Sequence, residues 1–362
     1  MAEFESDPNS SFEDRDAGGE QGRGVKQILA FVVVLALVGA VAAYGHRALD
    51  LPMQQTEIHQ VVEVPDGASF KEVANLLAQK GLIISPFWFR LLGKFQDAER
   101  KIKPGEYDLH TAMRPVEILN TLVSGRVIQY SVTIQEGLTA RQIGKVLGAT
   151  GIVKEADVAR LVADAAFIKA LGIDAPTLEG YLFPDTYYFP KRAKTEDVVR
   201  AMVSRLRQAF TPELRAQSAA LQLTEIQVLT LASIIEKETG QDAERPLISA
   251  VFHNRLRKGM LLQSDPTVIY GIPNFNGNLT RKDLARPTRF NTYTNTGLPP
   301  GPIANPGARS IVAALNPAPV SYLFFVSKND GTHQFSATIG EHNRAVEHYQ
   351  KRIARQPARK AA

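Results

Sequence analysis

A carboxylate near the end of a strongly apolar segment, Glu236, is the residue best suited to proton-transfer chemistry. The segment Leu231–Thr239 is predicted to be helical, and at about 100° per residue Glu236 falls between Leu229 and Ala232 on its apolar side. Burial among apolar side chains raises the pKa of a carboxyl group, so that it holds a proton near neutral pH and acts as a general acid. Glu238 points toward the polar side, where it could orient a substrate or form a surface ion pair. The competing interpretation of Glu236 is structural: it caps the helix end or pairs with a core arginine, because glutamate is seldom fully buried unpaired.

Composition and motifs exclude several other chemistries. No P-loop or dinucleotide-binding glycine signature occurs, nor a His-Glu-x-x-His zinc motif, a G-x-S-x-G elbow or an S-x-x-K nucleophile motif. The chain has no cysteine and its seven histidines are scattered, so neither a thiolate site nor a metal cluster is predicted. The net charge of +5 is mild, and no basic stripe interleaved with aromatic residues indicates nucleic-acid binding. Carboxylate, amide, hydroxyl and aromatic groups in the C-terminal half remain, which suits cleavage of a glycoside without a cofactor.

Further candidates for substrate contact follow or precede the apolar helix in three polar and aromatic segments. Asp265 precedes a proline, so a helix cap explains it as well as chemistry does. Tyr181 and Phe183 could present exposed rings to sugars, although clustered aromatic rings more often form core. Taken singly, each polar candidate is also explained by a structural role. The candidates are Tyr181, Phe183, Glu238, Gln263, Asp265, Thr267, Tyr270, Asn291, Thr292 and Tyr293.

Four long motifs, in this order, resemble the endolytic murein transglycosylase family (MltG, YceG-like). The matching strings are Glu179–Tyr187, Ala232–Thr239, Gln263–Gly271 and Asn291–Ile303. The resemblance implies an α+β protein with one membrane anchor, a LysM-like region and a mixed α+β catalytic domain, acting without a cofactor. It also implies a lyase that cuts MurNAc–GlcNAc bonds within peptidoglycan glycan strands, leaving 1,6-anhydroMurNAc ends and ending strand elongation.

The resemblance places the catalytic glutamate at Glu236. This residue would protonate the glycosidic oxygen and then take a proton from the muramyl 6-hydroxyl, so no second carboxylate is needed. Tyr181 and Phe183 stand where other members can carry Trp, which keeps a stacking surface. Penicillin-binding proteins or other wall synthases are expected partners. Two alternatives remain, a glycan-binding scaffold that does not cut and a hydrolase that pairs Glu236 with Asp265 or Glu244.

The N-terminal part of the chain predicts a membrane anchor. Residues 28–44 form an uncharged, almost wholly apolar run of 17 residues, near the lower limit for a membrane span. We predict a transmembrane helix over 28–46, after a disordered tail over 1–27 that lies in the cytoplasm. The catalytic part would lie outside the bacterial inner membrane. A cleaved signal peptide is the alternative, since residues 40–42 resemble a cleavage site. The orientation rests on a slight positive-inside bias from the flanking basic residues Arg23, Lys26 and Arg47.

A weak internal repeat organises the region after the anchor. Val62–Ser69 resembles Val132–Thr139 at an offset of 70 residues. Each copy predicts a short strand, a glycine turn, a Ser or Thr cap and an amphipathic helix that ends at glycine. The repeat alone fits a glycan-binding unit and a spacer equally. The family resemblance implies a LysM-like region over 51–153 and a catalytic domain over 154–350, followed by a basic tail over 351–362.

Overall fold

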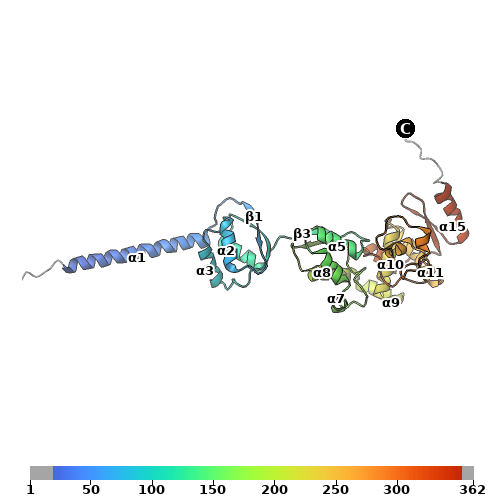
Figure 1. Ribbon diagram of the computed structural model, residues 1–362, viewed down its shortest axis with the longest axis horizontal. Coiled ribbons are helices and arrows are strands. Elements are labelled where there is room, and N and C mark those ends of the chain that lie inside the picture. The colour runs from blue at the N-terminus through green and yellow to red at the C-terminus, as the bar shows by residue number, and fades with distance from the viewer. Residues whose placement is uncertain (1–18, 353–362) are drawn as a thin grey trace, which may run out of the picture. The chain divides into compact units, whose positions relative to one another are not determined.

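The computed structural model describes residues 19–352, and their contacts divide the chain after Ile128 into two compact units (Figure 1). The predicted α+β class is confirmed, since helices dominate and the described strands form small antiparallel sheets of two strands each. Residues 1–18 of the predicted N-terminal tail and residues 353–362 of the predicted basic tail lie outside the described residues.

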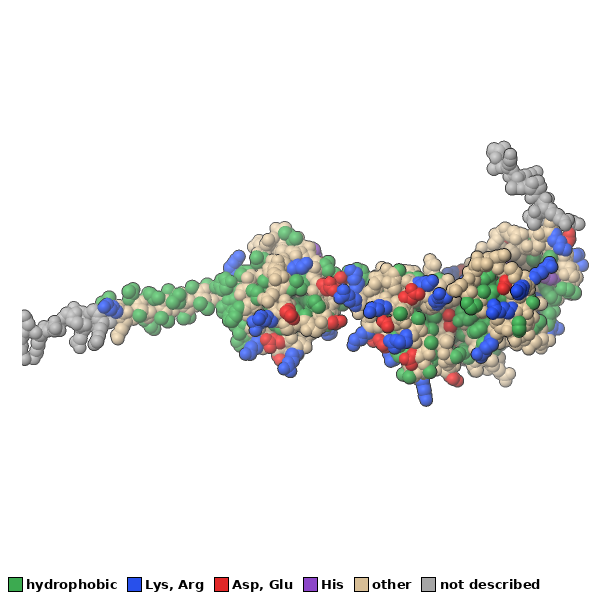
Figure 2. Space-filling view, viewed as in Figure 1, with side chains coloured by type: hydrophobic (Ala, Val, Ile, Leu, Met, Phe, Trp, Pro, Cys, Tyr) green, Lys and Arg blue, Asp and Glu red, His purple; other side chains and the backbone are tan. Residues whose placement is uncertain are grey.

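The N-terminal helix α1 spans Gly19–Asp50. It is longer than the predicted 28–46 and includes residues 19–27, which were predicted to be disordered. Its segment Val25–Asp50 is long and apolar enough to cross a membrane. From Val25 to Tyr44 its side chains are exposed, and Gly45 is the first buried residue after them. Figure 2 shows the hydrophobic surface along this helix.

The rest of the first unit surrounds one small core. Strands β1 and β2 pair antiparallel with Val62 opposite Tyr107, and both side chains are fully buried. The ring of Phe70 stacks on that of Phe89 at 5.6 Å. The elements are β1 (His59–Val64), α2 (Phe70–Gln79), α3 (Pro86–Phe95), β2 (Gly105–His110) and α4 (Pro115–Ser124).

The internal repeat appears in the structure as two copies of a strand, a turn and a helix. The second copy consists of β3 (Tyr130–Thr133) and α5 (Ala140–Ala149). The turns hold Gly67 and Gly137 at the same positive φ of 75°, a conformation that glycine adopts without strain. Capping boxes start both helices, because Ser69 and Thr139 accept hydrogen bonds from the third helical residue. Matching buried positions are Val73 with Ile143 and Leu77 with Leu147.

The second copy of the repeat belongs to the second unit. β3 pairs antiparallel with β4 (Thr186–Phe189), and the side chains of Val132 and Ile134 enter the core of that unit. The division therefore falls after Ile128 instead of after residue 153, since a sequence repeat does not reveal which sheet each copy joins. That the first region is LysM-like stays a prediction.

Helix α10 is the centre of the second unit. It spans Glu225–Glu238, contacts α11, α12 and α14, and is buried on every side from Val228 to Ile235. The predicted split into an apolar and a polar arc is therefore wrong for most of its length. Ser233, on the expected polar side, is fully buried, donates to the carbonyl of Thr230 at 2.7 Å and accepts the backbone N–H of Ile303 at 3.0 Å.

Of the remaining elements of the second unit, α11, α12 and α14 contact this helix. A C-terminal hairpin is formed by β5 and β6, and Gly331 takes a φ of 86° in its turn. The elements are α6 (Glu155–Val162), α7 (Ala165–Ala170), α8 (Thr195–Ala209), α9 (Pro212–Ala220), α11 (Arg245–Arg257), α12 (Asp265–Tyr270), α13 (Arg281–Leu284), α14 (Ala308–Leu315), β5 (Phe324–Ser327), β6 (His333–Ser336), α15 (Ile339–Val346) and η1 (Glu347–Arg352).

Candidate active site

Glu238, the last residue of α10, is a carboxyl group with unusual surroundings. It is partly exposed, and the buried hydroxyl of Ser264 donates a hydrogen bond to its Oε1 at 2.5 Å. Burial raises its pKa from the ordinary 4.5 to about 7, since the nearby carboxylate of Asp265 adds to the effect while Ser264 and Arg255 oppose it only in part. Glu238 can therefore carry a proton near neutral pH. The predicted surface ion pair for this residue is wrong.

The segment that carries Ser264 is held in place by its backbone. Helix α11 ends before Gly259, whose φ is 65°, and Gln263 also takes a positive φ, of 51°. The N–H of Gln263 donates to the carbonyl of Thr292 at 3.1 Å, and the N–H of Ser264 donates to the Thr292 hydroxyl at 3.0 Å. Two of the sequence motifs are thereby joined beside the end of α10.

Three polar side chains lie near Glu238 in this arrangement. The hydroxyl of Tyr293 donates to Oδ1 of Asp265 at 2.6 Å. Burial raises the pKa of Tyr293. The hydrogen bond to Asp265 and the charges of Asp265 and Glu238 raise this pKa further, so Tyr293 is close to both carboxyl groups. The buried guanidinium of Arg255 donates to the carbonyls of Leu262 at 2.9 Å and Leu323 at 2.7 Å. Arg255 was not among the predicted residues, since its only signal is a charge within an otherwise buried helix.

The exposed members of this group are the ones able to contact a substrate. Gln263 and Asp265 are exposed, and Tyr293 is partly exposed. Gln263 also accepts a long hydrogen bond from Arg255, at 3.3 Å. The structure thus brings together four of the predicted residues, namely Glu238, Gln263, Asp265 and Tyr293. The N-cap of α12 is Ser264, and Asp265 is the first residue of the helix. The prediction that Asp265 caps this helix is therefore wrong.

Other predicted contact residues lie behind this surface. Thr267, Asn291 and Thr292 are at most 1% exposed, so none of them reaches a substrate directly in this conformation. The hydroxyls of Thr267 and Thr292 lie 2.9 Å apart. The amide of Asn291 donates to the carbonyls of Leu284 and Arg286 and accepts the N–H of Tyr293. These hydrogen bonds position the loop that carries Tyr293.

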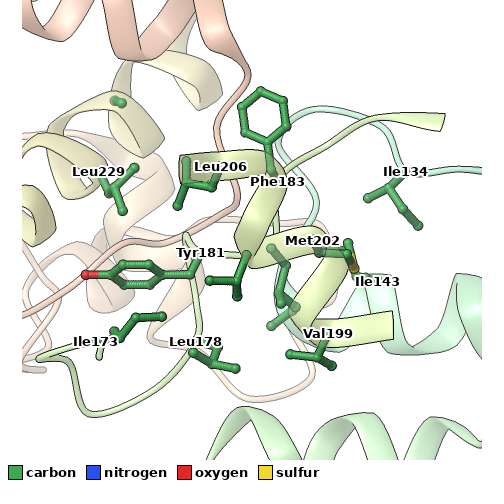
Figure 3. Close-up of a cluster of buried hydrophobic side chains, with 14 of the residues drawn as sticks. Ile134, Ile143, Ile173, Leu178, Tyr181, Phe183, Val199, Met202, Leu206 and Leu229 are labelled. Carbon is green, nitrogen blue, oxygen red and sulfur yellow. The ribbon is translucent and has the colours of Figure 1, made fainter. Parts of the chain in front are cut away.

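The predicted aromatic contacts are core residues. Tyr181 and Phe183 are 2% and 5% exposed and pack among aliphatic side chains (Figure 3), so the prediction of exposed rings is wrong and the core alternative holds. Tyr270 lies at the opposite end of α12 from Asp265, and its ring packs edge-on against Phe290 at 4.8 Å.

Glu179 is a second buried carboxyl that the sequence did not single out. It accepts hydrogen bonds from the N–H of Ala140 and the amide of Asn305, both at 2.9 Å, and from the hydroxyl of Tyr270 at 3.2 Å. Burial raises its pKa to about 7. Its oxygens are occupied by groups from three separate segments, which indicates a structural role.

Glu236 is one half of a buried ion pair. Its Oε1 lies 3.0 Å from a guanidinium nitrogen of Arg245, and its Oε2 accepts the N–H of Gly307 at 2.9 Å. The side chains of Glu236 and Arg245 are each 6% exposed. The alternative in which Glu236 pairs with a core arginine therefore holds. The pair joins the end of α10 to the start of α11 and to the loop before α14.

Glu244, considered as a second carboxylate, is also engaged. It accepts the N–H and the Nδ1 of His333, both at 2.7 Å, and the hydroxyl of Thr239 at 3.3 Å. Within the part of the chain that the structure describes, no three His, Asp or Glu side chains are grouped as a metal site.

Comparison with known proteins identifies the family. The model of the YceG-like family matches residues 62–348. The chain belongs to the YceG-like family. A Bacillus subtilis (strain 168) relative named endolytic murein transglycosylase is 33% identical, over 86% of this chain and 91% of the relative. A Streptococcus pneumoniae (serotype 2) protein of the same name is 28% identical over 90% of this chain, which spans 66% of that longer relative.

A YceG-like protein of known structure supports the fold. The crystal structure of the yceG-like protein from Listeria monocytogenes is 34% identical, with a TM-score of 0.55, over 79% of this chain and 98% of that one. The family resemblance drawn from four sequence motifs is thus confirmed.

Proposed function

We propose that this YceG-like protein is a membrane-anchored lytic transglycosylase that cuts MurNAc–GlcNAc bonds within peptidoglycan glycan strands. Relatives named endolytic murein transglycosylase support the reaction and its substrate. We propose further that Glu238 is its general acid in place of Glu236. The observation that carries this assignment is the pKa of the Glu238 carboxyl, raised to about 7, in a partly exposed residue whose described hydrogen-bond donor is Ser264.

The contrast between the two glutamates supports the change of assignment. Glu236 offers one oxygen to Arg245 and the other to the backbone of Gly307, so neither is open to a glycosidic oxygen. Glu238 has one described hydrogen-bond donor, Ser264, and lies beside the exposed side chains of Gln263 and Asp265. A general acid must approach the bond it protonates, and Glu238 meets that condition.

The chemistry proceeds in two proton transfers through the same group. The carboxyl of Glu238 donates its proton to the glycosidic oxygen, the bond from that oxygen to the muramyl anomeric carbon breaks, and GlcNAc leaves with a free 4-hydroxyl. The resulting carboxylate takes the proton of the muramyl 6-hydroxyl, whose oxygen bonds to the anomeric carbon. The product is a 1,6-anhydroMurNAc end, and Glu238 is protonated again.

A hydrolase is the second candidate, because a second carboxylate lies near the acid. Asp265 is close enough to raise the pKa of Glu238 and is exposed. In hydrolysis a second carboxylate activates water or attacks the sugar. The hydroxyl of Tyr293 donates a hydrogen bond to Asp265, and this bond would hold the Asp265 carboxylate in a fixed orientation.

Analysis of the products separates the candidates. Purified protein is incubated with uncrosslinked glycan strands, and the new ends are read by mass spectrometry. Anhydro ends, retained in an Asp265→Asn variant at a reduced rate, support the proposal. Reducing ends that depend on Asp265 indicate a hydrolase, and intact strands indicate a glycan-binding scaffold.

The proposed setting is the bacterial inner membrane, with the N-terminus in the cytoplasm and residues after α1 outside. The apolar helix α1 and the basic residues that flank it support this placement. Because the chain lacks cysteine, a single cysteine placed at Tyr188, which is 65% exposed, reports its own side of the membrane to an impermeant thiol reagent. Penicillin-binding proteins and other wall synthases remain proposed partners, to be tested by crosslinking.

A further inference from the structure

Helix α3 of the first unit has an exposed face that its fold does not explain. Phe87 and Phe95 are 66% and 82% exposed, the highest values among large apolar side chains outside α1 in the described residues. The exposed fraction of Phe87 is the same as that of Ile28 on α1, which is also 66%.

The two exposed rings lie on one continuous side of the helix. Phe87, the partly exposed Leu91 and Phe95 are four residues apart and so share one face. Arg90 and Lys94 are exposed on its flank. The opposite side points into the unit, since Phe89 is 1% exposed.

Helix α3 also packs directly on α1. The ring of Trp88 lies against Gly45, where a Cβ atom would be 3.0 Å from it. Trp88 adjoins the exposed face at Phe87, and the two rings meet edge-on at 5.6 Å. The apolar surface of α1 therefore continues onto α3, in keeping with the hydrophobic side chains at this edge of the unit in Figure 2.

The length of α1 sets the depth at which this contact occurs. A bilayer core of about 30 Å needs about 20 helical residues. Residues 25–44 of α1 supply that length, and Gly45 is the first residue that the folded unit covers. Trp88 and the face beside it thus lie at the level where hydrocarbon gives way to headgroups.

We propose that α3 lies in the membrane interface, with Phe87, Leu91 and Phe95 inserted among the lipid chains. Arg90 and Lys94 reach the headgroups beside them, as basic residues of interfacial helices do. The first unit is then held against the bilayer by two elements, the span α1 and the interfacial helix α3. This inference rests on the proposed membrane span of α1 and adds a second point of attachment to it.

The absence of cysteine makes a direct test possible. Single cysteines replace Phe95, Leu37 or Val61 in the full chain, and each is labelled with an environment-sensitive fluorophore. The labelled proteins are reconstituted in phosphatidylethanolamine–phosphatidylglycerol vesicles whose acyl chains carry bromine, a contact quencher. Leu37 on α1 is 60% exposed and reports the span, while Val61 on β1 is 51% exposed and is the matched position away from α3.

The inference predicts that the Phe95 label is quenched several-fold more than the Val61 label and approaches the Leu37 label. Equal, weak quenching at Phe95 and Val61 with strong quenching at Leu37 would overturn it while leaving the span intact. Weak quenching at Leu37 as well would refute the proposed span and this inference with it. As a second readout, a Phe87→Ser/Phe95→Ser variant should reduce bromolipid quenching of Trp88, the only tryptophan, whereas Val61→Ser should not.

Discussion

The hydroxyl of Ser264 donates to Glu238 at 2.5 Å, and the two residues are 26 positions apart in the chain. Glu236, on the last turn of the same helix, faces Arg245 instead. One helix end therefore carries a carboxyl that can hold a proton and a carboxylate that secures the fold.

The pH dependence of cleavage should report Glu238. The protonated form is the active one, so the rate is expected to be highest below a pKa of about 7 and to fall about tenfold per pH unit above it. The Ser264 hydrogen bond lowers this pKa, and Ser264→Ala should therefore move the alkaline limb to higher pH. Ser249→Ala is the matched control, because that buried hydroxyl has no hydrogen-bond partner among residues 19–352. A limb that stays in place in Ser264→Ala contradicts the assignment.

Breaking the Glu236–Arg245 pair should cost stability more than chemistry. Removing Glu236 takes one carboxylate partner from the buried Arg245, which keeps Asp242 at 3.0 Å. It also leaves the N–H of Gly307 without its acceptor, and such a loss destabilises by about 1–3 kcal/mol. We expect Glu236→Met to lower the unfolding temperature, and Glu236→Met/Arg245→Met to recover part of the loss. Calorimetry of the three proteins measures this. A single variant with unchanged stability would show that the pair is not structural.

Sequence reasoning captured the local features of this chain and missed those formed between distant segments. The caps at Ser69 and Thr139 and the turn at Gly137 depend on a few adjacent residues, and they were predictable. The helical projection of Glu236 could not include Arg245, which begins the next helix. The projection also assumed that one side of the helix is exposed to solvent. The surroundings of Glu238 come from Ser264, Asp265 and Tyr293, which lie at least 26 positions further along the chain.

Gly180 should tolerate no side chain. Its φ is 86°, and an added Cβ would lie 2.4 Å from the ring of Pro302. Gly180→Ala is expected to destabilise the second unit by about 2 kcal/mol or more, through both strain and overlap. Gly301→Ala is a control next to Pro302 on the opposing loop, since a Cβ added there would meet nothing within 4 Å. Chemical denaturation of both variants tests the difference, and equal losses would count against this packing.

Glu179 should make stability depend on pH. Its pKa rises from 4.5 to about 7 on folding, so the folded state binds the proton more tightly. Its favourable contribution is present in full below pH 4.5 and is lost as pH rises through about 7, a change of about 3 kcal/mol at most. Unfolding followed from pH 4.5 to 8 should show this fall, and Glu179→Gln should flatten it. An unchanged slope in the variant would assign the effect elsewhere.

The most direct test of the account compares Glu238→Gln with Glu236→Gln on purified glycan strands. Each variant is first shown to be folded by circular dichroism, and the rate of anhydroMurNAc formation is then measured by mass spectrometry. The account predicts that Glu238→Gln loses about a hundredfold or more of the rate. Glu236→Gln, where folded, should retain most of the rate. The reverse result, with cleavage surviving in Glu238→Gln and lost in folded Glu236→Gln, would contradict the assignment of the acid.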